Sequence, residues 1–245
     1  MDAYFPVMRR GNFLKPCLLV LFVSAACSPA RVTITKAELS RLRSETKIPV
    51  VIHAPAPFSF VSTEDNFRTA LAAGAAGALT GGLGCVLVGM HAESRARAQG
   101  EALARANALE DPALKVRDGF LSALVNQFNM TNLVPLDETF ATDDPKSMGE
   151  KLGAGIVLDF KTGDWRLIPA GSDAHYRVVY RVRSRFFRTS DQKVVWQGYC
   201  RYEPDDTHAA LPELTAGSGV LLRDKMDEAA EACAATLLVQ FLGQD

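Results

Sequence analysis

The sequence has few of the residues that build metal centres. It contains four histidines and five cysteines in 245 residues. None of the histidines has the close His, Cys or carboxylate spacing of a zinc site; they are His53, His91, His175 and His208. We therefore expect no metal ion.

Catalytic and phosphate-binding patterns are also missing. No nucleophile elbow, phosphate loop or dinucleotide fingerprint is present, and the glycine-rich stretch 81–84 lacks the lysine and hydroxyl that hold phosphate. Neither sign of charge is in excess, with 27 Lys and Arg against 28 Asp and Glu. Because nucleic-acid binding requires a basic surface, we expect no nucleic-acid partner. The sequence predicts neither catalytic residues nor a cofactor.

The N-terminal residues have the composition of an export signal. Arg9, Arg10 and Lys15 precede an apolar run over 17–26, which ends in Ser-Ala-Ala before Cys27. A transmembrane helix needs roughly 20 apolar residues, so this run is too short to span a bilayer. Small residues before a cysteine favour cleavage by a signal peptidase at that point.

This pattern resembles the signal peptide of bacterial lipoproteins. The resemblance implies cleavage after residue 26, lipidation of Cys27 and attachment to a membrane through the N-terminal lipid. Ser28, which is not aspartate, implies passage to the outer membrane, facing the periplasm. Ser24 departs from the pattern because a larger aliphatic residue is usual there, so plain secretion and a retained anchor are the alternatives.

Of the other four cysteines, only two are candidates for a disulfide. Cys17 belongs to the signal, and Cys85 lies in an apolar stretch. Cys200 and Cys233 are left for the oxidising side of the membrane. They either form a disulfide or are two small buried hydrophobic residues.

Periodicity and capping residues divide the chain into four parts. These are a signal peptide over 1–26, an anchor-proximal segment over 27–68, an Ala/Gly-rich apolar helix with a charged continuation over 69–110, and a periplasmic domain over 111–245.

Helices are predicted where a capping residue precedes an apolar period: Thr35 to Ser44, a helix opened by Asp111-Pro112, Asp144 to Gly153, and Val220 to Leu242. Strands are predicted at Ile48–Ile52, Asn132–Leu136, Gly155–Lys161, Tyr176–Arg188 and Lys193–Tyr202. This order predicts an α+β fold, in which helices cover a small mixed sheet with a C-terminal antiparallel meander.

Residues 111–198 resemble the periplasmic domain of lipid-anchored envelope proteins of the curli-secretion-channel and penicillin-binding-protein-activator type. The residues that carry the resemblance are Phe120 and Leu124 on a helix, then Asn132–Pro135, Leu152–Val157 and Val195–Gly198. The resemblance implies a non-catalytic domain that binds other envelope proteins or copies of itself.

Small residues recur every four positions in the uncharged stretch 69–90. They are Thr69, Ala73, Gly77, Gly81, Cys85 and Gly89. On a helix this spacing makes one smooth stripe, which allows a second helix to approach closely. The stretch is interpreted as a membrane-embedded or self-associating helix; a glycine-rich loop, or a helix buried against the protein's own sheet, is the alternative.

Arginines occupy alternate positions of one predicted strand. Arg177, Arg181, Arg183 and Arg185 fall on one face of it, and apolar residues fall on the other. The basic face predicts either an anion-binding patch or a solvated sheet face with acidic neighbours.

Together these features predict a lipid-anchored envelope protein with a binding or assembly role. The alternatives are a subunit of an oligomeric secretion or transport structure, and a periplasmic hydrolase whose site has no recognisable motif.

Overall fold

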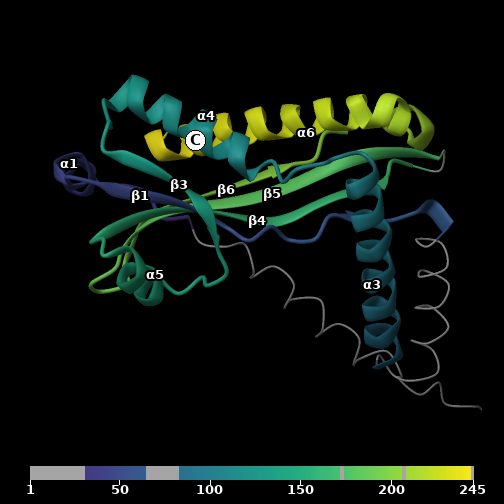
Figure 1. The fold of residues 1–245 in the computed structure, drawn as a ribbon, viewed down its shortest axis with the longest axis horizontal. Helices are drawn as coiled ribbons and strands as arrows, with labels where there is room; N and C mark the ends of the chain where they lie inside the picture. Colours follow the sequence, from purple (N-terminus) through teal and green to yellow (C-terminus); the bar gives the residue numbers. More distant parts are fainter. Residues whose placement is uncertain (1–30, 65–82, 172–173, 206–207, 244–245) are drawn as a thin grey trace, which may run out of the picture. The chain divides into compact units, whose positions relative to one another are not determined.

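A mixed β-sheet lies at the centre of the fold (Figure 1). The computed structural model describes residues 31–64, 83–171, 174–205 and 208–243. The strands are β1 Ile48–His53, β2 Ser59–Phe60, β3 Leu133–Phe140, β4 Ile156–Pro169, β5 His175–Arg188, β6 Val194–Tyr202 and β7 Ala209–Ala210. The helices are α1 Lys36–Ser44, α3 Leu83–Ala106, α4 Ala113–Phe128, α5 Pro145–Leu152 and α6 Leu211–Leu242.

The strand order combines parallel and antiparallel pairs. The main path runs β3-β1-β4-β5-β6, with β2 beside β4 and β7 beside β5. β1 is parallel to both β3 and β4, whereas β4, β5 and β6 form an antiparallel meander. The predicted α+β class, with a mixed sheet and a C-terminal meander covered by helices, is confirmed.

The first long strand belongs to the same sheet as the C-terminal meander. Every residue of β1 is buried, and the strand lies between β3 and β4. The described residues form one compact unit. The segment that precedes the Ala/Gly-rich stretch therefore supplies an interior strand of the domain.

The two faces of the sheet are covered differently. α4 and α6 pack side by side against one face, and Figure 1 shows both helices along it. Aromatic rings fill that interface: the Phe120 ring centre is 5.4 Å from that of Trp196 and 6.0 Å from that of Phe241. A smaller cluster, which includes Met148 of α5 and Val157 of β4, forms a second core.

Capping residues begin and end the short helices as the sequence predicts. Thr35 accepts a hydrogen bond from the Glu38 amide at the start of α1 (3.2 Å). Asp144 accepts one from the Ser147 amide at the start of α5 (2.8 Å). Gly153 ends α5 with φ +58, a left-handed conformation that suits glycine.

The last helix starts earlier than predicted and is broken. Residues 216–219 have non-helical backbone angles within α6, and the regular helix resumes at Val220. Gly217 and Gly219 both have positive φ in this break. Gly219 also faces the buried side chain of Asn107, and a Cβ at Gly219 would lie 2.6 Å from the Asn107 Cβ. The break in α6 therefore lies against Asn107, the residue that follows α3.

Alanine substitutions at the two glycines should separate backbone strain from close packing. Gly217→Ala should lower the free energy of unfolding by about 1 kcal/mol, the cost of a left-handed alanine. Gly219→Ala adds a steric clash and should lower it by about 2 kcal/mol or more. Urea denaturation of both variants checks this, and equal losses would contradict the packing at Gly219.

Candidate functional site

A fixed connector joins α3 to α4. The Leu109 amide donates to the Ala104 carbonyl (2.9 Å), which closes the C-terminal end of α3. Ala108 has φ +49, and a left-handed alanine costs about 1–2 kcal/mol. Such strain persists only where the surrounding contacts hold the backbone, and it is frequent at functional sites. The connector, residues 107–112, is therefore a candidate for a functional segment.

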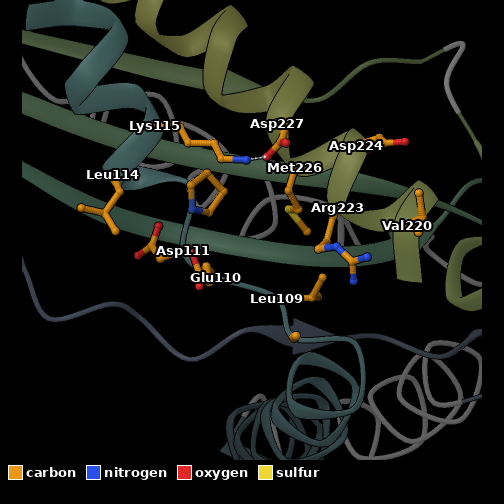
Figure 2. Close-up of a pocket in the computed structure, with 12 residues that line it drawn as sticks. Leu109, Glu110, Asp111, Leu114, Lys115, Val220, Arg223, Asp224, Met226 and Asp227 are labelled. Carbon is orange, nitrogen blue, oxygen red and sulfur yellow. Dashed lines mark hydrogen bonds and ion pairs between the residues drawn. The ribbon is translucent and has the colours of Figure 1, made fainter. Parts of the chain in front are cut away.

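One groove lies between the connector, α4 and α6 (Figure 2). Its volume is about 360 Å³. Lys115 of α4 forms an ion pair with Asp227 of α6, drawn as a dashed line in Figure 2. Leu114 and Val220 line the same groove and are 46% and 50% exposed. The groove thus offers both apolar and charged contacts to a partner.

Arg223 of α6 connects two walls of the groove by hydrogen bonds. Its guanidinium Nη1 donates to the Asn107 carbonyl oxygen (2.8 Å) and to the Ser218 carbonyl oxygen. These bonds connect the end of α3 to the break in α6.

A second cavity, of about 440 Å³, shares Leu109, Glu110, Asp111 and Leu114 with the groove. Residues of β1, β3 and β4 complete its walls. Most of the lining is apolar, but carboxylates of the connector and of β3 also face it. Cavities of this size and composition are typical of small-molecule sites.

Asp111 lies at both cavities and has two roles. Its Oδ1 accepts hydrogen bonds from the Ala113 amide (2.9 Å) and from the Thr162 hydroxyl (2.7 Å). The first of these bonds holds the start of α4, but Pro112, and not Asp111 as predicted, occupies the N-cap position. Burial raises the pKa of Asp111 above its ordinary value, against the lowering effect of these two bonds. Its Oδ2 is buried and has no hydrogen-bond partner among the described residues.

Thr162 extends this arrangement into the core, since its hydroxyl lies 3.3 Å from the Tyr180 hydroxyl. Burial, with the nearby charge of Asp111, raises the pKa of Tyr180. The sequence gives a signal only for the capping role of Asp111, because Thr162 and Tyr180 lie far from it along the chain.

A buried ion-pair network lies elsewhere on the sheet. The Asp159 side chain has 0% exposure, and its Oδ2 accepts hydrogen bonds from Arg185 Nε (2.9 Å) and Arg183 Nη2 (3.3 Å). His53 Nε2 lies 2.9 Å from the same oxygen. His53 comes from β1, Asp159 from β4 and the arginines from β5, so the network spans three neighbouring strands.

Asp143 completes this network from the loop before α5. Its carboxylate accepts hydrogen bonds from Arg183 (2.7 Å), Arg185 (2.6 Å) and Lys161 (2.8 Å). Burial raises the pKa of Asp143, but the bonds from Arg183 and Lys161 outweigh it and hold the pKa well below its usual range.

The network contains a trio of groups that could in principle hold a metal ion. His53, Asp143 and Asp159 each offer a ligand atom, and these atoms lie within 4.8 Å of one another. The sequence gives no sign of this trio because its members are distant along the chain. Arginine donors already bind both carboxylates, so a metal ion would have to displace them. The chemistry of the site therefore favours ion pairing.

The arginines of the predicted basic face mostly have acidic partners. Arg183 and Arg185 bind Asp143 and Asp159, as described above. Arg177 binds Glu203 (3.1 Å) and Asp205 (2.6 Å), whereas Arg181 is exposed. This arrangement favours the interpretation as a sheet face with acidic neighbours over an anion-binding patch.

The other predicted residues lie partly outside the described residues. Cys27, Ala73, Gly77 and Gly81 are outside them. Cys85 and Gly89 lie in the first part of α3, residues 83–90, of which only the backbone is described. Among the helices of the described part of the chain, none is both long enough and apolar enough to cross a membrane.

Further along α3, a small residue does allow close packing. A Cβ at Gly100 would lie 2.2 Å from the Phe58 carbonyl oxygen. The backbone of α3 therefore lies directly against the residues at the start of β2.

A disulfide joins the sheet to the helix layer. Cys200 of β6 and Cys233 of α6 are bonded, with a Cα–Cα distance of 5.3 Å and 33 residues of sequence separation. A loop of this length corresponds to about 3–4 kcal/mol of stabilisation in the chain-entropy model. The bond thus fixes α6 against β6.

Comparisons with known proteins show only distant structural similarity. No family model and no curated protein matches the chain. The chain is similar to the PelC dodecamer structure from Paraburkholderia phytofirmans, with 12% identity, a TM-score of 0.28 and coverage of 83% of this chain and 93% of that chain. It is also similar to lipoprotein GNA1162 from Neisseria meningitidis, with 12% identity, a TM-score of 0.25 and coverage of 75% and 98%.

Removing the Asp159 charge should destabilise the fold strongly. Asp159→Asn leaves two guanidiniums with less compensation in a buried site, and breaking such a pair costs about 3 kcal/mol or more. Asp191→Asn is the control, because the Arg188–Asp191 pair is at the surface and should contribute much less. Urea denaturation measures both, and a loss for Asp159→Asn no larger than for the control would show that the network does not stabilise the sheet.

Proposed function

We propose that this chain is an exported, lipid-anchored protein of the cell envelope that acts by binding rather than by catalysis. The observation that carries the proposal is the leader over 9–27, with its basic start, short apolar run and small residues before Cys27. Acylation of Cys27 would attach the mature chain to a membrane.

The Cys200–Cys233 disulfide supports export. Structural disulfides persist in oxidising compartments such as the periplasm and are rare in the cytosol. The bond lies between two principal elements of the fold, β6 and α6, rather than at a redox-active surface motif. A protein that relies on this bond for stability is suited to a compartment outside the cytoplasm.

The described residues also support a binding role. Their buried His–Asp pair, His53 with Asp159, is engaged by Arg183 and Arg185, so ion pairing accounts for its presence. The groove beside the connector instead exposes Leu114 and Val220, and exposed apolar residues around a groove are suited to contact with another molecule.

The location and the partner are part of the same proposal. Ser28 after the acylated cysteine supports a location at the outer membrane, facing the periplasm. The small-residue stripe within 70–90 would pack against a helix of another envelope protein, against the bilayer, or against copies of itself. The last case corresponds to a subunit of an oligomeric secretion or transport structure.

Substitution of Cys27 should abolish acylation. We expect Cys27→Ser in the full chain, expressed in a bacterium with two membranes, to lose incorporation of an alkyne-labelled palmitate. Cys85→Ser is the matched control and should retain it. Unchanged labelling of Cys27→Ser would contradict the lipid anchor.

Bulky residues in the stripe should disrupt its packing. We expect Gly77→Leu combined with Gly81→Leu to reduce the oligomer size, or to change the ease of detergent extraction, because leucine prevents close helix approach. Leu79→Ala, which lies off the stripe, serves as the control. An unchanged oligomer size and unchanged extraction would exclude the packing role.

A further inference from the structure

The second cavity has apolar walls that suit an organic ligand. Ile52 and Pro55, Leu136 of β3 and Trp165 of β4 line it, together with Leu114 of α4. Trp165 is fixed in position, because its ring packs 4.9 Å from that of Phe58 and its indole nitrogen donates to the Ala56 carbonyl. A volume of about 440 Å³ fits a small molecule that buries an alkyl or aryl group.

The charged groups of the cavity lining are almost all of one sign. Glu110, Asp111, Asp137 and Glu138 contribute four carboxylates. No lysine or arginine is among the described residues that line this cavity, although Lys151 lies 2.6 Å from the Glu138 carboxylate. The other titratable group, His53, is held by Asp159. The carboxylates would repel a hydrophobic molecule with a negative charge and attract one with a positive charge.

Asp111 contributes a half-buried carboxylate that lacks a full set of partners. Its Oδ1 has two hydrogen bonds, whereas its buried Oδ2 has none within the described residues. An unpaired buried carboxylate oxygen is costly, and a cation near it would lower that cost.

We propose that this cavity binds a small hydrophobic cation, an alkyl or arylalkyl ammonium. The apolar part occupies the space between Trp165, Leu136 and Leu114. The ammonium group lies toward the carboxylates of the connector and β3, with Asp111 as the principal partner. This proposal rests on the binding role proposed above and adds a class of ligand to it. It does not depend on the lipid anchor.

Binding of three probes that share one ring tests the proposal. The probes are 2-phenylethylammonium, 2-phenylethanol and 3-phenylpropanoate, titrated calorimetrically into the purified full chain in a non-ionic detergent. We expect the ammonium to bind at least about tenfold more tightly than the alcohol or the carboxylate, and to weaken as salt is added. Equal binding of the three probes, or no binding of the ammonium, would overturn the proposal.

Variants locate the site. Asp111→Asn keeps a side-chain oxygen for the Ala113 amide and should reduce ammonium affinity about tenfold or more. Asp191→Asn, whose side chain pairs with Arg188 at the surface and lines neither cavity, should bind as the unmodified chain does. Thermal unfolding confirms that each variant is folded.

A second pair of substitutions keeps the test decisive if Asp111→Asn does not fold. Glu110→Gln with Asp137→Asn changes two exposed carboxylates at the rim and should reduce ammonium affinity several-fold. Undiminished affinity in every folded acidic variant would place the ligand elsewhere. Loss of ammonium binding would leave the acylation of Cys27 untouched, so the two proposals fail separately.

Discussion

The carboxylate of Asp159 has no exposure to solvent. One of its oxygens, Oδ2, contacts His53 of β1 and both Arg183 and Arg185 of β5. A charge buried in this way is tolerated only when opposite charges and hydrogen bonds surround it. The requirement fixes the relative positions of three strands, because each must bring its side chain to the same oxygen. It also fixes which face of β5 carries its arginines, and therefore which face is left for the aromatic core under α4 and α6.

Two aspartates differ in whether cationic side chains balance their charge. Asp143 lies among three cationic side chains, which hold its pKa below the usual range. Asp111 is half-buried without a cationic partner in the described part of the chain, and desolvation raises its pKa. The first carboxylate therefore has its charge balanced within the protein, whereas the second does not. This difference is the reason that the cavity beside Asp111, rather than the larger charged network, is assigned a ligand.

Features of the fold that depend on neighbouring residues could be predicted from the sequence. Thr35, Asp144 and Gly153 begin or end their helices as expected, because capping needs only residues three or four positions apart. The alternation of apolar and basic residues also identifies β5. What local patterns do not contain is the pairing of distant segments. The position of β1 between β3 and β4, and the contact of His53 with Asp159 across 106 residues, follow from the topology of the sheet. For the same reason, the sequence does not show which acidic residues pair with the arginines, or that a cavity lies beside the connector.

Export and anchoring are the central claim, and the intact mass of the native protein, isolated from membranes without reducing agent, tests it most directly. The account predicts a chain that begins at Cys27, carries covalent lipid on that residue, and contains the Cys200–Cys233 bond. A full-length, unmodified chain with free thiols, recovered from the soluble cytoplasm, would contradict it.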